Sequence, residues 1–201
     1  MEPYSLRGEL CELTPFNPAD TQRVFDYCQD GEIQRWVPVP VPYRMEDAAV
    51  FTTSTAQKGW GGPGLVAERT WAIRQLGPDG KPYLAGAVCL RPNPPGASAE
   101  IGYLLAADSR GRGLATDAVN TAVGHAIRDL GMRRVYWQAL VGNWASRRLA
   151  VRCGFKVEGT LRSQLIIRGV AADAWVGTIL AEDLASDDGY WTADGRVRLW
   201  D

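Results

Sequence analysis

The chain has 201 residues, of which 46% are hydrophobic, so it is long enough and apolar enough to form one domain around a core. Its formal net charge of −1 and its pI of about 5.9 argue against a general affinity for nucleic acid. The chain lacks a basic and apolar leader and any apolar run near the roughly 18 residues that span a bilayer. We therefore expect a cytoplasmic protein that binds no membrane.

Hydrophobic periodicity, capping residues and turn residues predict the elements in chain order. In the first part of the chain we expect a strand at 10–14, a helix from a cap at 17–20 to about 30 closed by Gly31, an extended proline-rich stretch at 36–42, and a helix at about 45–58. Three strands should follow, at about 69–75, 84–90 and 100–105. The second part should hold a long helix from 114 that ends before Gly131, a strand at 135–140, a short helix after 143, and strands at about 156–165 and 174–180. This order predicts an α/β (α+β) fold with a mixed, mostly antiparallel central sheet of about seven strands and helices on both faces. We expect one domain over residues 1–201, with 183–201 as a C-terminal extension.

The segment Arg110-Gly-Arg-Gly-Leu-Ala-Thr116 lies between an apolar run and the long amphipathic helix. Unpaired N–H groups and the dipole at a helix N-terminus attract anions. Gly111 and Gly113 allow a phosphate to approach the backbone closely, and Arg110 and Arg112 add positive charge. The segment therefore predicts a pyrophosphate site.

A glycine loop before a helix is not specific by itself. In a dinucleotide-binding fingerprint the third glycine would stand at Thr116, and an acidic residue would follow the next strand, where Val141-Gly-Asn143 offers none. No Gly-Lys-Ser/Thr follows, so a Walker loop is excluded as well. A plain strand-to-helix turn remains as the alternative to a phosphate site.

Three motifs in order resemble the GNAT N-acetyltransferases, and in particular the RimJ/RimL-like branch. Arg110-Gly-Arg-Gly-Leu-Ala115 resembles the family's cofactor motif Q/R-x-x-G-x-G/A, and Glu100-Ile-Gly-Tyr103 resembles its central-strand motif. Asn143 to Phe155 matches N-x-x-S-x(7)-G-F. The resemblance extends more weakly from Leu10 to about Glu182. It implies a GNAT fold and acetyl-CoA as co-substrate, with no metal.

The resemblance also implies roles for single residues. The cofactor-binding residues would be Leu105, Arg110, Gly111, Arg112, Gly113, Leu114, Ala115, Thr116, Asn143 and Ser146. Glu100 is the candidate general base, because a carboxylate within an apolar strand has a raised pKa when it is partly buried, with an exposed strand-edge glutamate as the alternative. Ser146 is the candidate hydrogen-bond donor to the CoA sulfur, and a simple partner of the Asn143 helix cap is its alternative. Tyr103 is an alternative acid.

The acceptor is the least constrained part of the analysis. Trp36 and Tyr43, in the connector of the first two helices, are the candidate substrate-binding residues. We expect transfer of an acetyl group to a primary amine, either a protein N-terminal amine such as that of a ribosomal protein, or a small-molecule amine (an antibiotic, a polyamine or an amino-acid derivative). A CoA-binding protein without turnover is a further alternative. We expect no nucleic-acid partner and a monomer or homodimer.

Overall fold

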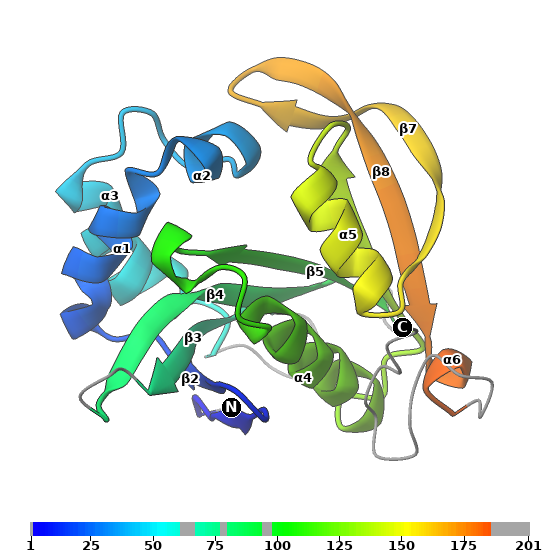
Figure 1. Ribbon diagram of the computed structural model, residues 1–201, viewed down its shortest axis with the longest axis horizontal. Helices are drawn as coiled ribbons and strands as arrows, with labels where there is room; N and C mark the ends of the chain where they lie inside the picture. The colour runs from blue at the N-terminus through cyan, green and yellow to red at the C-terminus, as the bar shows by residue number, and fades with distance from the viewer. Residues whose placement is uncertain (1, 61–66, 77–79, 94–97, 186–201) are drawn as a thin grey trace.

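The computed structural model of the protein describes residues 2–60, 67–76, 80–93 and 98–185. Its centre is an eight-stranded sheet in the order β1-β2-β3-β4-β5-β6-β8-β7 (Figure 1). The strands are β1 (Leu6–Arg7), β2 (Glu12–Pro15), β3 (Arg69–Leu76), β4 (Pro82–Pro92), β5 (Ser98–Leu105), β6 (Arg134–Leu140), β7 (Lys156–Ile167) and β8 (Val170–Leu180). Neighbouring strands are antiparallel except β5 and β6, which are parallel. The prediction of a mixed, mostly antiparallel sheet is confirmed. The additional strand, β1, has two residues, too few for an alternating pattern to reveal.

The two parallel strands pair over only half of their length. The ladder runs from Ser98 opposite Arg134 to Ile101 opposite Trp137. Beyond that point residues 102–105 of β5 pair with β4, while residues 138–140 of β6 pair with β8. Figure 1 shows β5 and β8 running in clearly different directions. The sheet therefore opens between β5 and β6 towards their C-terminal ends.

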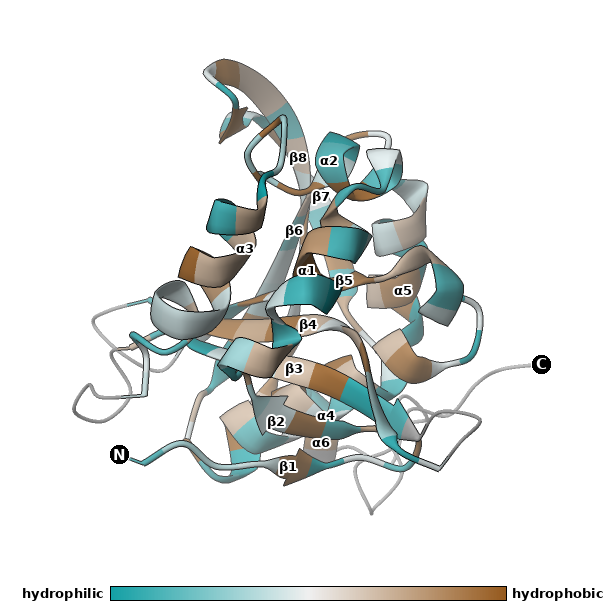
Figure 2. Ribbon diagram, turned by 90° about the vertical axis from the view of Figure 1, so that its left-hand side faces the viewer, coloured by the Kyte–Doolittle hydropathy of each residue, from teal (hydrophilic) through white to brown (hydrophobic). Residues whose placement is uncertain are grey.

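Helices cover both faces of the sheet, as predicted. They are η1 (Pro18–Asp20), α1 (Thr21–Cys28), α2 (Gly31–Trp36), α3 (Met45–Val50), the π-helical turn η2 (Phe51–Thr55), η4 (Ala107–Ser109), α4 (Leu114–Arg128), α5 (Trp144–Arg152) and α6 (Ala181–Ala185). Trp71 of β3 packs in one core cluster with Val119 of α4, whereas its neighbour Ala72 packs in a second cluster with Val24 of α1. Figure 2 shows α1 and α3 on the face turned to the viewer. Because successive strand residues point to opposite faces, the two clusters lie on opposite sides of the sheet.

Two helix boundaries differ from the sequence prediction. Gly31 begins α2 rather than closing α1, because the carboxylate of Asp30 accepts a hydrogen bond from the Glu32 amide at 3.0 Å and caps a new helix. The helix expected at about 45–58 ends as α3 at Val50 and continues as the π-helical turn η2. In the expected C-terminal extension, residues 183–185 belong to α6, and residues 186–201 lie outside the described part of the chain.

Candidate active site

A cavity of about 810 Å³ extends through the opening between β5 and β6. Its walls come from α2, the strands β3 to β7, the glycine loop, and the first turns of α4 and α5. Most predicted site residues line it: Trp36, Glu100, Leu105, Arg110, Gly111, Gly113, Leu114, Ala115, Thr116, Asn143 and Ser146. Tyr43 and Arg112 are not among its lining residues. The structure thus brings together residues that lie more than a hundred positions apart in the sequence.

The glycine loop forms the predicted helix entry. Gly111 and Gly113 have φ angles of 76° and 79°, in the left-handed region that favours glycine. Gly113 is the N-cap of α4, and the next three residues of the helix, Leu114 to Thr116, line the cavity. Their N–H groups have no intrahelical acceptor, since the first turn of a helix lacks preceding carbonyls. The positive end of the α4 dipole therefore faces the cavity.

Two arginines of this loop are fixed to neighbouring groups. Arg110 donates from Nε to the carbonyl oxygen of Leu105 at 3.2 Å and forms an ion pair with Asp30, the N-cap of α2. Arg112 donates to the carbonyl oxygen of Asp108 at 2.8 Å. Arg110 therefore connects the glycine loop to both the end of β5 and the start of α2, a role that the sequence motif does not indicate.

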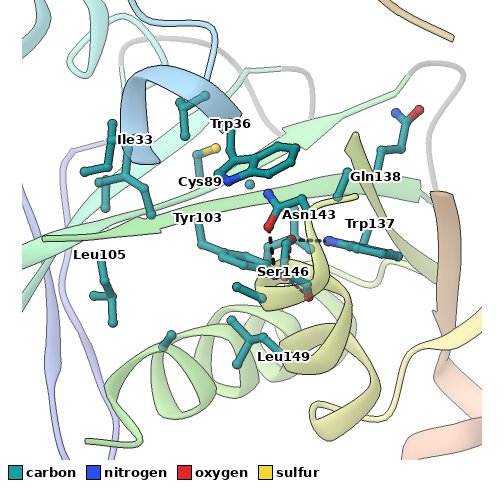
Figure 3. Close-up of a pocket in the computed structure, with 18 of the residues that line it drawn as sticks. Ile33, Trp36, Cys89, Tyr103, Leu105, Trp137, Gln138, Asn143, Ser146 and Leu149 are labelled. Atoms are coloured by element: carbon teal, nitrogen blue, oxygen red, sulfur yellow. Dashed lines mark hydrogen bonds between the residues drawn. The ribbon is translucent and has the colours of Figure 1, made fainter. Parts of the chain in front are cut away.

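The hydroxyl of Ser146 lies at the centre of a hydrogen-bond network. The indole Nε1 of Trp137 donates to Ser146 Oγ at 2.9 Å, and the Tyr103 hydroxyl lies 3.1 Å from both Oγ and the carbonyl oxygen of Ser146. The Asn143 side chain caps α5 by accepting from the Ser146 amide at 3.1 Å. Figure 3 shows Tyr103 and Trp137 directed towards Ser146. The helix cap is therefore present, but it uses the amide of Ser146 and leaves its hydroxyl for other partners.

Glu100 lies in a row of polar side chains across the strands. Its Oε1 is 3.5 Å from Nη1 of Arg91, the residue opposite it on β4, and Gln138 of β6 hydrogen bonds to its carboxylate. Burial raises the pKa of Glu100 above its ordinary value, and the negative charge of Glu68 adds to this, while Arg91 and the hydrogen bond from Gln138 act in the opposite direction. The side chain remains 24% exposed to the cavity. Glu100 is therefore a partly buried carboxylate, rather than an exposed strand-edge residue.

Arg91, Glu68 and Gln138 were not identified from the sequence. Arg91 bridges the two acidic residues, since its Nε donates to Glu68 at 3.2 Å. A Cβ at Gly102 would lie 2.9 Å from both Arg91 Nη1 and Cys89 Sγ, so a larger residue there would displace the guanidinium or the thiol. The Arg91–Glu100 contact follows from the β4–β5 register, and that register is the signal from which it could have been found.

Glu100 and Ser146 approach the cavity from opposite faces of the sheet. Ser146 contacts Tyr103 and Trp137, which pack on the α4 side. Glu100 alternates along β5 with Ile101 and Tyr103, so it belongs to the α1–α3 side. Since the sheet is open beyond Ile101 and Trp137, the cavity reaches both groups. A substrate on one face and a second substrate on the other would therefore meet in this opening.

The two candidate acceptor residues have different surroundings. Trp36 lines the cavity, donates from Nε1 to Glu32 at 2.9 Å, and has its Cη2 3.6 Å from where a Cβ at Gly142 would lie. Tyr43 is 7% exposed and packs in the core formed by α1, α3 and the sheet. The structure therefore brings Trp36 to the cavity, and it places Tyr43 in the core, where its hydroxyl hydrogen bonds to Cys28 of α1.

Three further features of the described residues concern cysteines, metal-binding groups and helix hydropathy. All four cysteines are free and buried. In the described ranges, no three His, Cys, Asp or Glu side chains come together as a metal-binding group. No helix in the same ranges has the length and hydropathy needed to cross a membrane.

Comparisons with known proteins agree with this architecture. The segment 11–156 matches the acetyltransferase (GNAT) domain family. A Bacillus subtilis protein, YdaF, provisionally named a ribosomal N-acetyltransferase, is 39% identical over 75 residues, which is 37% of this chain and 41% of that protein. The chain thus spans less than half the length of this curated relative.

Solved structures match over a larger part of the chain. A Vibrio cholerae protein, provisionally named a ribosomal-protein-serine acetyltransferase, superposes with a TM-score of 0.78 at 16% identity, over 90% of this chain and 99% of that one. Mycobacterium smegmatis RimJ, solved with CoA-disulfide, gives a TM-score of 0.75 at 22% identity, over 92% and 93% of the two chains. These likenesses show a shared fold. Together with a family match over more than half of the sequence, they show that the chain belongs to the GNAT family of acetyltransferases.

Proposed function

We propose that this protein transfers the acetyl group of acetyl-CoA to a primary amine. The observation that carries the proposal is one continuous cavity through the opened sheet, with the α4 N-terminus and Ser146 on one face and Glu100 on the other. Acetyl transfer needs a held thioester, a deprotonated amine and a stabilised leaving sulfur. The cavity offers a group for each of these requirements.

The α4 face fits acetyl-CoA. The N–H groups of Leu114 to Thr116 suit a pyrophosphate, which the helix dipole also favours. The Ala106 amide donates to the carbonyl oxygen of Ala85 on β4. Because the backbone groups of successive strand residues point to alternate sides of the strand, the amide and carbonyl of Leu105 point to the opening. There Arg110 donates to the Leu105 carbonyl. Beyond Ile101 this edge of β5 pairs with no strand among the described residues, so the amides of the pantetheine arm can hydrogen bond to it as an added strand would. Bound there, acetyl-CoA supplies the activated acyl group.

The α1–α3 face fits a cationic amine. Two carboxylates, those of Glu68 and Glu100, lie around the guanidinium of Arg91 in this part of the cavity, and Glu32 lines it from α2, whereas Arg110 and Arg152 line it from the glycine loop and from α5. The excess of negative charge around Arg91 attracts an ammonium and repels a carboxylate close to it. Glu100, with its raised pKa, accepts a proton from the ammonium so that the amine nitrogen can attack.

Within this class we propose a protein N-terminal amine, such as that of a ribosomal protein, as the acceptor. A peptide carries a neutral amide next to its amine, whereas a free amino acid carries a carboxylate that the acidic wall repels. The provisional name of the relative YdaF supports the same choice. A small-molecule amine is the alternative acceptor.

The expected cytoplasmic location is supported by the four free and buried cysteines.

An acceptor panel tests the proposal. Purified protein is given acetyl-CoA and, separately, peptides with free N-termini, the same peptides with blocked N-termini, polyamines and free amino acids, and CoA release is measured. We expect release only with free amines, and fastest with peptides. Preference for polyamines would favour the small-molecule alternative. Tight acetyl-CoA binding without release for any amine would leave a non-catalytic CoA-binding protein, and no acetyl-CoA binding would overturn the proposal.

A further inference from the structure

We propose that Tyr103 and Trp137 are positioning residues that direct the Ser146 hydroxyl proton into the cavity. The inference rests on the proposed function, and it assigns roles to two residues that the sequence motifs leave without one. Tyr103 belongs to β5 and Trp137 to β6, the two strands whose separation forms the opening. Both side chains reach Ser146 at the start of α5.

The donors and acceptors of this network can be counted. An indole N–H only donates, so Trp137 Nε1 gives its proton to Ser146 Oγ at 2.9 Å, and it also interacts with the nearby Tyr103 hydroxyl oxygen. Tyr103 has one hydroxyl proton and two acceptors at 3.1 Å, the carbonyl oxygen and Oγ of Ser146. When Tyr103 donates to the carbonyl, the proton of Ser146 satisfies the Tyr103 oxygen. When Tyr103 donates to Oγ, the Ser146 proton is left for the cavity.

The change between these two arrangements needs only rotation of two hydroxyl protons. The heavy atoms stay in place, because Trp137 is 1% exposed and Asn143 holds the Ser146 amide. In the second arrangement Oγ accepts two hydrogen bonds and donates one, and such a chain polarises the donated O–H. A donor fixed in advance at developing negative charge stabilises a transition state without reorganisation.

Tyr103 keeps its proton throughout. Burial raises the pKa of Tyr103 well above its ordinary value, so transfer of its proton to a departing thiolate is uphill. In the proposed step the amine nitrogen forms a bond to the acetyl carbon, the carbon–sulfur bond breaks, and the electron pair leaves on sulfur as a thiolate. The ammonium loses two protons in all: one goes to Glu100 before the attack, and the second leaves the nitrogen after the attack and is taken up by the departing sulfur, which gives the CoA thiol. Ser146 donates a hydrogen bond to the thiolate, and no proton travels along the Tyr103–Ser146 pair.

Three variants test this assignment through the bound CoA thiol. The pKa of the CoA thiol is measured from the absorbance of its thiolate. We expect this pKa to be lower for CoA bound to the wild-type protein than for free CoA. Ser146→Ala should abolish this effect and lower kcat about 10- to 100-fold, since one donor to developing charge is lost. Tyr103→Phe should abolish part of it and lower kcat about five- to tenfold, the value of one hydrogen bond. Tyr4→Phe is the matched control, since it removes a hydroxyl that lies 2.7 Å from Nε2 of His125 on α4, and neither residue lines the cavity.

The double variant Tyr103→Phe/Ser146→Ala separates positioning from packing. If Tyr103 acts through Ser146, the double variant should be no slower than Ser146→Ala within about twofold, because coupled residues are not additive. Additive losses, or an unchanged thiol pKa in a folded Tyr103→Phe protein that still binds CoA, would overturn the inference. The proposed function fails differently, through loss of CoA binding or of amine acetylation in the wild-type protein.

Discussion

The two faces of the sheet hold their site residues in different ways. On the α4 face, apart from the edge of β5 at Leu105, the groups that fit acetyl-CoA belong to two short segments, 110–116 and 143–146, each at the start of a helix. On the α1–α3 face, Glu68, Arg91, Glu100 and Gln138 come from four separate segments that strand register brings together, and Glu32 joins them along the cavity from α2. Local backbone geometry therefore determines one half of the site, and long-range packing determines the other. Substitutions on the two faces should affect different kinetic constants.

The largest effect is expected at Glu100. Replacing it in Glu100→Gln keeps the size and removes the proton acceptor, so kcat should fall about 100-fold, the usual scale for loss of a general base. Acetyl-CoA affinity, measured by calorimetry, should stay within about twofold, because Glu100 lies on the other face. Unchanged kcat would remove Glu100 from the mechanism, and equal losses in kcat and cofactor affinity would remove the division between faces.

The pH profile sharpens this prediction. A general base works when unprotonated, so activity falls as pH decreases through the pKa of Glu100, which burial raises above the ordinary carboxyl range. Arg91 lowers that pKa, so Arg91→Gln should move the acidic limb of kcat/KM to higher pH, while Arg91→Lys, which keeps the charge, should leave it nearly in place. A limb that is identical in wild type and Arg91→Gln would contradict the assignment of the limb to Glu100.

The same contrast explains what could be predicted from the sequence. Residues 110–116 and 143–146 could be identified because the spacing within a helix start fixes their geometry, and Glu100 stands out as a charge in an apolar strand. Trp137 and Gln138 were not identified, since their partners lie on other elements. Gln138 also accepts from Gln164 at 3.0 Å, a contact that depends on an irregularity of β7 between Leu161 and Leu165. No local pattern encodes such a register shift.

An intermediate effect is expected at the N-terminus of α4. Ala115→Asp places a negative charge where we expect the pyrophosphate, and should weaken acetyl-CoA binding at least tenfold, about 1.4 kcal/mol. The helix itself should not be destabilised, because an acidic residue in the first turn interacts favourably with the dipole. Gly113 is a poorer site for this test, since at φ 79° any side chain adds backbone strain.

Ala115→Asn is the matched control for this charge. The asparagine side chain has nearly the same size as aspartate and no charge, so acetyl-CoA affinity should fall much less in Ala115→Asn than in Ala115→Asp. The difference between the two variants should shrink as salt is added, because salt screens the repulsion. Equal losses in both variants at all salt concentrations would mean that the side chain blocks the site sterically and that no phosphate lies there.

The smallest effects should separate Trp36 from Tyr43. Trp36 lines the cavity on the acceptor face, so Trp36→Ala should raise the KM for a peptide acceptor about fivefold or more, the scale of one aromatic contact, and leave acetyl-CoA affinity unchanged. Tyr43 is buried, and its hydroxyl hydrogen bonds to Cys28. Tyr43→Phe should therefore lower the free energy of unfolding by about 1 kcal/mol, with acceptor KM unchanged. Steady-state kinetics and thermal unfolding on the same preparations distinguish the two. A raised acceptor KM in Tyr43→Phe at unchanged stability would restore Tyr43 to the acceptor site, because a hydroxyl confined to the core can affect KM only through the stability of the fold.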